Sequence, residues 1–418
     1  MVKLYGWDTA YATKLSELNK SLATAHNLPR HFTQTWINRS FDCTVSRWDI
    51  VKGGAGKLLH IQATIGAGTF ISSGQKSDLS GVTIIFEVDL TLLPESAGHT
   101  SYHANIKTAG KKGDKAGDGV VVPYAIDVNG HSIGFLDQLF LMNYLAKSLV
   151  GQAAAFTFAF AQINLVPPTV KDTWLTPVEI AYDVYGPQNG DDHLVIYTAT
   201  RKRDVSLLPH QVDPDLMTGA GPAYFAFSKN LFLENIVKPV MPDVFANSRA
   251  RDFLFDPAHS QIESTVPIAM DKVKSGLIWY HPVITKVVTT VSKSNIETRV
   301  QGVCDLHLGM SMTFVVSSSC PVTFDAATSK VTVHADPSPQ TSHDTHVPWY
   351  DYLAGAIPDI IIAIVVPIIG NGIAKGMNRA LGNLAISSAG PQSVSWPGGT
   401  VFQANAGFLD DGFQLSGT

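Results

Sequence analysis

The sequence predicts an α+β protein in which antiparallel strands outnumber helices and two similar modules follow one another. Residues 36–128 contain strand-like runs between glycine-rich turns, with almost no helical periodicity. Only 16% of the 418 residues are charged and 45% are hydrophobic, against about 25% charged in a typical globular chain. This balance indicates a large apolar interior or an apolar ligand. The order helix, strands, helix, strands occurs twice, which predicts two related modules.

The first element is predicted to be an amphipathic helix over residues 8–26. Asp8 is a favourable N-cap, and four apolar residues recur at spacings of four, three and four positions. These residues are Tyr11, Leu15, Leu18 and Leu22. We expect them to pack against the concave face of a sheet, and they are also candidate residues of an apolar ligand groove.

Strands then follow in the first half, because β-branched and apolar residues alternate with polar or small ones. The runs are DCTVSRWDIV (42–51), KLLHIQATI (57–65), VTIIFEVDLTL (82–92), AFTFAFAQINL (155–165), VEIAYDVY (178–185) and HLVIYTATR (193–201). A helix is predicted at about 135–150, between the third and fourth runs.

The second half repeats this order. Residues 228–245 are typical of an amphipathic helix that Ser228 caps and that bends or ends near Pro239 and Pro242. The remaining elements are strands at 277–291, 295–308, 312–319 and 330–335, an apolar helix region at 350–385, and a final short strand, acidic turn and GFQLSG. The predicted organisation is a first module at 1–205, a linker at 206–221 and a second module at 222–418.

The most apolar segment is DIIIAIVVPIIGNGIAKG, residues 359–376. Fifteen residues separate Asp359 from Lys375, and Pro367 interrupts them, whereas a spanning helix needs about 20 predominantly apolar residues. We therefore expect a buried helix that does not span a membrane. Its candidate ligand-facing residues are Ile361, Ile364, Val365 and Ile368.

A GxSxG motif at Gly130–Gly134 could indicate a lipase or esterase with Ser132 as nucleophile. Such enzymes place the serine on a parallel sheet, which requires strands to alternate with helices along the chain. Roughly 90 residues before Gly130 contain strands and turns without crossover helices. The motif is therefore interpreted as a strand-to-helix turn, and the hydrolase stays an alternative.

Other local patterns indicate loops. GGAGKL at 53–58 lies between two strands and lacks the Ser or Thr of a phosphate loop, so it predicts a hairpin turn. Two histidine pairs, HTSYH at 99–103 and HDTH at 343–346, have no evident third metal ligand. The loop KTAGKKGDKAGDG offers Lys111, Lys112 and Lys115, either as a mobile surface or as contacts for anionic headgroups.

Net charge, cysteine count and the N-terminal sequence limit the classes of protein that remain. A net charge of −5 argues against a general nucleic-acid binder, which needs a basic face. Three cysteines form no disulfide framework, and free buried thiols are expected, although Cys304 and Cys320 could meet across a hairpin. The N-terminal sequence has no apolar core of signal-peptide type, so synthesis without a cleaved export signal is expected.

Three stretches resemble the clostridial P-forty-seven family, whose members are encoded beside certain neurotoxin genes. They are LYGWDTAYATKLSELNKSL near the N-terminus, FDCTVSRWDIVKGGAGKLLHIQATIGAGTF (41–70) and AYFAFSKNLFLENIVKPVMPDVF (223–245). That family is similar to the tubular lipid-binding (TULIP) superfamily, which includes bactericidal permeability-increasing protein. The resemblance implies an elongated fold in which long antiparallel sheets wrap around long helices and leave an apolar groove.

The resemblance also implies a non-enzymatic function. It suggests a bacterial protein, made in the cytoplasm and in some cases released, that binds a lipid or another apolar molecule or accompanies a toxin and its accessory proteins. It carries over no catalytic, cofactor or metal residues. A structural partner of a toxin complex with a filled core remains the second hypothesis, and an esterase using Ser132 the third.

Overall fold

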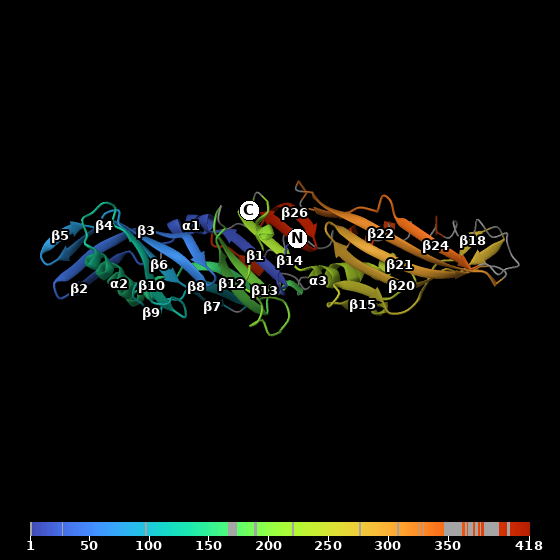
Figure 1. Cartoon of the computed structure of the whole chain (residues 1–418), viewed down its shortest axis with the longest axis horizontal. Coiled ribbons are helices and arrows are strands. Elements are labelled where there is room, and N and C mark those ends of the chain that lie inside the picture. The colour runs from blue at the N-terminus through green and yellow to red at the C-terminus, as the bar shows by residue number, and fades with distance from the viewer. Residues whose placement is uncertain are drawn as a thin grey trace.

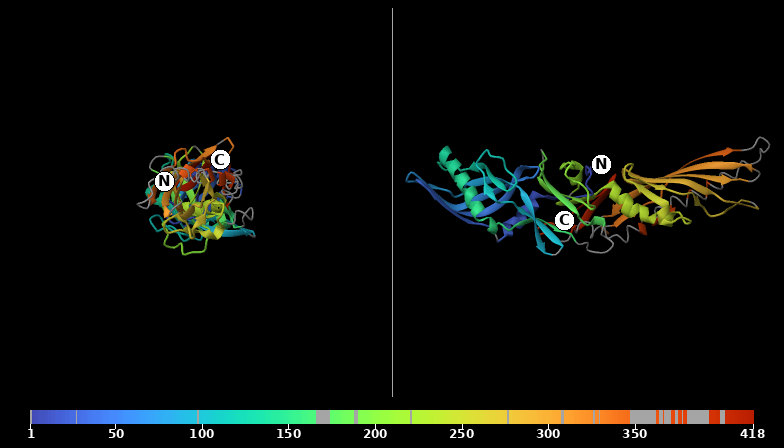
Figure 2. Two further views of the ribbon diagram at one scale, coloured as in Figure 1. Left: turned by 90° about the vertical axis from the view of Figure 1, so that its right-hand side faces the viewer. Right: turned by 90° about the horizontal axis from the view of Figure 1, so that it is seen from below.

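The computed structural model of the chain is elongated, and both termini lie near its middle (Figure 1). Viewed along its long axis, the molecule is far narrower than it is long (Figure 2). The structure describes residues 2–26, 28–96, 98–165, 174–187, 190–219, 221–275, 277–306, 309–325, 327–328, 330–346, 362–363, 366, 371–372, 375–376, 378–379, 393–398 and 402–418. Within them the protein is mostly antiparallel β-sheet with few helices.

One end of the molecule contains a seven-stranded sheet of order β2-β3-β4-β6-β10-β9, in which β5 also pairs with β4. Its strands are β2 (His31–Trp36), β3 (Arg39–Ala55), β4 (Leu58–Ser72), β5 (Gln75–Asp78), β6 (Thr83–Val88), β9 (Thr108–Ala109) and β10 (Val120–Asp127). Helix α2 (Phe135–Gly151) follows β10 and buries Leu141, Leu145 and Leu149 in the main core. The helix predicted at 135–150 is confirmed.

A four-stranded sheet of order β25-β11-β8-β7 lies next along the molecule. Three of its strands come from the first half of the chain: β7 (Leu90–Ser96), β8 (His99–Ala104) and β11 (Ala159–Asn164), which follows the short helix η1 (Ala153–Ala155). The fourth is β25 (Val394–Ser395), whose residues pair with Gln162 and Ile163 of β11. A segment from the end of the chain therefore completes a sheet of the first half.

The central sheet has six strands in the order β12-β13-β1-β14-β27-β26. They are β12 (Glu179–Tyr185), β13 (His193–Ala199), β1 (Thr9–Lys14), β14 (Ala223–Phe227), β27 (Gly412–Gly417) and β26 (Ala404–Asp410). Each half of the chain contributes three strands. One face of the sheet belongs to the main core, and the other packs beneath a smaller core that includes Leu4, Trp7, Val212 and Leu216.

The predicted helix at 8–26 is wrong in its first half. Residues 9–14 form β1 between β13 and β14, and only Leu15–Thr24 is helical, as α1. A buried Tyr11 is compatible with either a helix or a strand. Backbone hydrogen bonds to a neighbouring strand on each side outweigh the helical spacing. Because α1 has only ten residues, the long helix expected at this position is absent.

The other half of the molecule contains an eight-stranded sheet of order β15-β16-β20-β21-β22-β23, with β17 on β20 and β24 on β22, and a separate β18–β19 hairpin. The strands of the sheet are β15 (Phe253–Asp256), β16 (Gln261–Ser264), β17 (Ile268–Ala269), β20 (Val283–Ser292), β21 (Asn295–Asp305), β22 (Ser311–Asp325), β23 (Lys330–Val333) and β24 (Gln340–His346). The hairpin consists of β18 (Val273–Ser275) and β19 (Ile278–Tyr280). The long strands predicted after residue 277 correspond to β20, β21 and β22.

The helical segment after β14 changes its hydrogen-bonding pattern along its length. It consists of α3 (Lys229–Phe232), the π-helical η4 (Leu233–Val237), the 3-10 helix η5 (Lys238–Val240) and α4 (Met241–Val244). The hydroxyl of Ser228 accepts a hydrogen bond from Leu231 N at 3.2 Å, so the predicted N-cap is confirmed. The π-helical part begins at Leu233, before either proline; Pro239 lies within η5 and Pro242 within α4, and each lacks the N–H that an α-helical hydrogen bond requires. The short 3-10 helices η3 (Pro214–Met217) and η6 (Ala250–Asp252) complete the described elements.

Four predicted groove residues, Ile361, Ile364, Val365 and Ile368, lie outside the described residues. Of their neighbours, Ile362 and Val366 are helical and pack, half-buried, against the main core. Among the helices that the structure describes, none combines the length and the hydropathy needed to cross a membrane.

Candidate functional site

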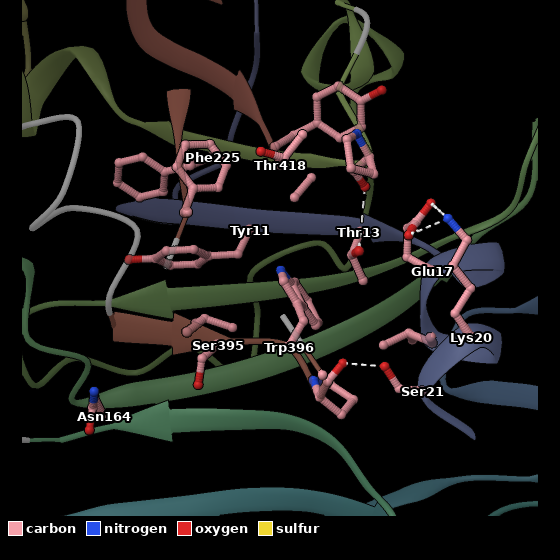
Figure 3. A pocket seen from close by; sticks show the side chains of 18 residues that line it. Tyr11, Thr13, Glu17, Lys20, Ser21, Asn164, Phe225, Ser395, Trp396 and Thr418 are labelled. Atoms are coloured by element: carbon pink, nitrogen blue, oxygen red, sulfur yellow. Dashed lines mark hydrogen bonds and ion pairs between the residues drawn. The ribbon is translucent and has the colours of Figure 1, made fainter. Parts of the chain in front are cut away.

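A pocket of about 650 Å³ lies at the middle of the molecule, where segments from both halves meet (Figure 3). Its walls come from β1, α1, β14, β25 and the C-terminal residue. The lining residues are Tyr11, Thr13, Glu17, Leu18, Lys20, Ser21, Asn164, Pro222, Ala223, Tyr224, Phe225, Val394, Ser395, Trp396, Pro397, Gly398, Phe402 and Thr418.

Aromatic side chains form the apolar wall. Tyr11 and Phe225 are directly opposite each other on β1 and β14, and their ring centroids are 4.7 Å apart. In Figure 3 the side chain of Trp396 lies between Tyr11 and Ser21. Leu18 is on the buried face of α1 and reaches the same space. An apolar chain can therefore contact rings on more than one side.

Polar groups gather at the α1 side of the pocket. Lys20 Nζ lies 2.8 Å from Glu17 Oε1, and the lysine side chain is largely exposed. The hydroxyl of Ser21 donates to the carbonyl of Pro397, which attaches the segment after β25 to α1. Thr13 Oγ1 donates to Pro222 O at 3.4 Å. The pocket thus has an apolar wall and one charged rim, the arrangement that suits an amphipathic molecule.

Burial raises the pKa of Tyr11 to about 12, although hydrogen bonds with Ser393 and Thr9 oppose the shift. The phenol is therefore neutral at physiological pH. A neutral, buried ring is a good surface for an apolar ligand and a poor general base.

The structure brings together only part of the predicted site. Tyr11 and Leu18 line the pocket, whereas Leu15 and Leu22 are buried in the main core without lining it. Sequence analysis missed Phe225, Val394, Trp396 and Phe402. The Trp396-Pro397 pair was visible in the sequence, but no local pattern links it to α1.

The predicted headgroup lysines lie elsewhere. Lys111, Lys112 and Lys115 are exposed on the loop between β9 and β10 and are not among the pocket residues. The backbone N–H of Lys112 donates to Asn143 Oδ1 of α2 at 3.1 Å, so this loop lies beside α2 and not beside α1.

Ser132 is not on a nucleophile elbow. Strand β10, which precedes it, is antiparallel to β6, and α2 begins three residues later at Phe135. Ser132 is exposed, and the ring of its neighbour His131 bonds Ser80 O through Nε2 at 2.8 Å. The GxSxG sequence thus forms the strand-to-helix turn that the sequence predicted.

The other motifs also form structural features. Ala55 pairs with Leu58 around a turn at Gly56-Lys57, so the GGAGKL segment is a hairpin end. Cys43, Cys304 and Cys320 are buried and not disulfide-bonded, as expected. Within the part of the chain that the structure describes, no three His, Cys, Asp or Glu side chains cluster closely enough to hold a metal ion.

Fold and pocket together define an elongated protein of antiparallel sheets with an apolar cavity between its halves. The chain belongs to the OrfX-like family, because the family model described as "OrfX-like: Protein OrfX2/OrfX3/P47" matches residues 4–379. The resemblance to the P-forty-seven family, based on three sequence stretches, is confirmed.

Two curated relatives come from Clostridium botulinum (strain Kyoto / Type A2). Protein P47 is 25% identical over 238 residues, which cover 56% of this chain and 55% of P47. Protein OrfX3 is 23% identical over 275 residues, which cover 59% of this chain and 56% of OrfX3. The chain therefore spans little more than half the length of these relatives.

Solved structures extend the likeness to the complete fold. P47 from Clostridium botulinum A2 superimposes with a TM-score of 0.77 at 20% identity, covering 100% of this chain and 98% of that chain. P47 of Clostridium botulinum E1 gives 0.72 at 19% identity, covering 99% of each chain. These comparisons establish a shared fold.

Proposed function

We propose that the protein is a non-enzymatic binder of a lipid or another apolar molecule, held in the pocket between its halves. The observation that supports this proposal is the pocket itself. At about 650 Å³ it falls within the range of roughly 300–1,000 Å³ typical of small-molecule sites. Aromatic rings form its wall and a charged pair forms its rim.

In this proposal an acyl chain lies against Tyr11, Phe225 and Trp396, and the polar end of the ligand lies near Glu17 and Lys20. Burial of apolar ligand surface contributes about 25 cal/mol per Å², so the rings provide most of the affinity. The charged pair orients the ligand, because the Lys20 ammonium group is largely exposed and, beside its bonds to Glu17, has a further N–H for a carboxylate or phosphate.

We also propose a TULIP-type architecture, with a first module at 1–205, a linker at 206–221 and a second module at 222–418, in which the sheets enclose helices. Helix α2 against the seven-stranded sheet and the helical segment 229–244 beside the eight-stranded sheet support a repeated plan. The family membership supports an accessory role beside a bacterial toxin.

Displacement of a fluorescent fatty acid from the purified chain would test the binding function, together with mass spectrometry of its lipid extract. Trp396→Ala removes one wall of the pocket and is expected to weaken binding roughly tenfold, equivalent to about 1.4 kcal/mol. Trp279→Ala is the matched control, because Trp279 is 54% exposed on β19 and is not a pocket residue.

Equal affinities for the two variants would contradict the pocket assignment. If the unmodified chain neither carried nor bound an apolar molecule, the alternative of a structural partner with a filled core would be favoured.

A further inference from the structure

Four large apolar side chains are exposed together at the end of the molecule that carries β2 and β5. Trp36 and Ile37 lie at the turn between β2 and β3 and are 46% and 82% exposed. Phe135 and Leu136 lie in the first turn of α2 and are each 70% exposed. Figure 1 shows β2 and β5 at the extreme left of the elongated molecule, with α2 beside them. We call these four residues the apolar tip.

Hydrogen bonds join the segments that carry the apolar tip. Arg39 Nε lies 2.6 Å from Asp137 Oδ1, and Ser72 Oγ donates to the same oxygen at 3.1 Å. Asn38 and Ser73 connect the two neighbouring hairpin turns through a side-chain bond and a backbone bond, both of 2.9 Å. The four apolar side chains are therefore presented by one connected unit rather than by independent loops.

The backbone conformation at Ile37 indicates that folding alone does not explain the exposure of its side chain. Its φ is 53°, a left-handed conformation that is unfavourable for a β-branched residue. Ile37 is the first residue of a two-residue hairpin turn, a position that favours Gly, Asn or Asp. Since the side chain is 82% exposed, little packing within the chain offsets this cost. Strained positions of this kind concentrate at functional sites.

The size of the apolar tip favours a lipid surface over a protein partner. With about 150–250 Å² for a large side chain, the four residues expose roughly 500 Å² of apolar surface. A standard protein interface needs about 800 Å² from each partner. An isolated projection of Trp, Phe, Leu and Ile at the end of a rod is sufficient for insertion into the interfacial zone of a bilayer, where aromatic side chains are favoured.

The charged side chains around the apolar tip are balanced. Asp137 is paired with Arg39. On β5 the exposed Lys76 and the exposed Asp78 lie two residues apart. Because these charges cancel, the apolar side chains provide the attraction to a lipid surface.

We propose that the apolar tip docks the protein onto the surface of lipid bilayers. This inference does not rest on the pocket, which lies at the middle of the molecule. It assigns the exposed Trp36, Ile37, Phe135 and Leu136 to shallow insertion.

Co-sedimentation with phosphatidylcholine vesicles tests the docking surface. The variant combines Ile37→Asn, Phe135→Ser and Leu136→Ser; asparagine suits the left-handed turn, so folding is expected to be retained. Vesicle partitioning should fall about tenfold or more, because three inserting side chains are lost.

Two control variants carry the same kind of change elsewhere. Leu207→Ser removes an 88% exposed leucine from the segment before η3, and Leu277→Ser removes a 95% exposed leucine at the opposite end of the molecule. Both should partition like the unmodified chain. Unchanged binding of the triple variant, or loss of binding in Leu277→Ser instead, would overturn the proposal.

Other outcomes are equally decisive. No vesicle binding by the unmodified chain would refute docking, and a dimer in solution that the triple variant dissociates would identify the apolar tip as a contact between copies. Trp396→Ala should bind vesicles normally, so failure of the pocket and failure of the docking surface are distinguishable.

Discussion

Replacement of Asp183 by asparagine should stabilise the protein at neutral pH and have much less effect in mild acid. Asp183 lies on β12 and is 6% exposed, and its Oδ1 atom has no hydrogen-bond partner among the described residues. Burial raises its pKa from 3.8 to about 6, and the backbone N–H of Val184 opposes the shift only in part. Its charge also contributes to the raised pKa of the buried Tyr197. Ionised Asp183 therefore costs stability in the native sheet.

The direction of the pH dependence follows from the pKa values of Asp183 in the folded and unfolded states. Because the folded pKa lies above the unfolded value, the folded state holds the proton more tightly, and stability falls as pH rises from about 4 to about 6. A shift of about two units corresponds to about 3 kcal/mol, of which about 2 kcal/mol is lost between pH 4.5 and pH 8. The Asp183→Asn variant has no carboxyl group at this position, so its free energy of unfolding does not fall in this way.

Urea unfolding of both proteins between pH 4.5 and pH 8 measures the difference. The advantage of Asp183→Asn in the free energy of unfolding should grow by about 2 kcal/mol across this range. Burial lowers the pKa of His193, which makes stability rise with pH through the window below 6.5, but both proteins share this effect and it cancels. Two parallel stability curves would refute the reasoning.

Three further substitutions or reactions test the assignment of other residues. Leu18→Ala should lower the free energy of unfolding by about 2–5 kcal/mol, whereas Ser16→Ala on the exposed face of α1 should change it by less than about 0.5 kcal/mol; equal losses would contradict the placement of Leu18. Ser132→Ala should hydrolyse short-chain nitrophenyl esters at the same background rate as the unmodified chain, and loss of a measurable activity would favour the hydrolase. Burial raises the pKa of Cys43 to about 12, so at pH 8 its peptide should react with maleimide only after unfolding; prompt labelling of the native chain would be inconsistent with that burial.

Local sequence patterns predicted the elements whose hydrogen bonds are local. The hairpin of β3 and β4 turns at Gly56-Lys57, and α2 begins after the turn at Gly134, because glycine spacing and apolar periodicity act over a few residues. The same reasoning assigned Tyr11 to a helix, because four- and three-residue spacings continue from it through Leu15 and Leu18.

The error at Tyr11 has a physical cause in distant pairing. Tyr11 pairs with Ile196 on one side and with Phe225 on the other, and the latter is more than 200 residues away in sequence. Backbone hydrogen bonds to two strands compete with those of a helix and prevail, as tertiary context commonly overrides local propensity. No local pattern contains that information.

Only some residues of the candidate site could be predicted from the sequence. Apolar periodicity found Tyr11 and Leu18, which line the pocket, but it also selected Leu15 and Leu22, which only fill the core. Periodicity detects burial and does not distinguish a cavity wall from a packed interior. Trp396 was missed because its place at the pocket depends on the pairing of β25 with β11.

The position of β1 explains why the pocket depends on both halves of the chain. β1 is hydrogen-bonded to β13 of the first half and to β14 of the second, so the backbone bonds that fix Tyr11 also fix Phe225. On the opposite wall, β25 pairs with β11, and Ser21 holds the carbonyl of Pro397. Each wall therefore contains a bond between segments that are distant in sequence. Separation of the halves would expose the edges of β1 and β14 and remove one side of the pocket, so cooperative folding of the complete chain is a condition for the proposed binding site.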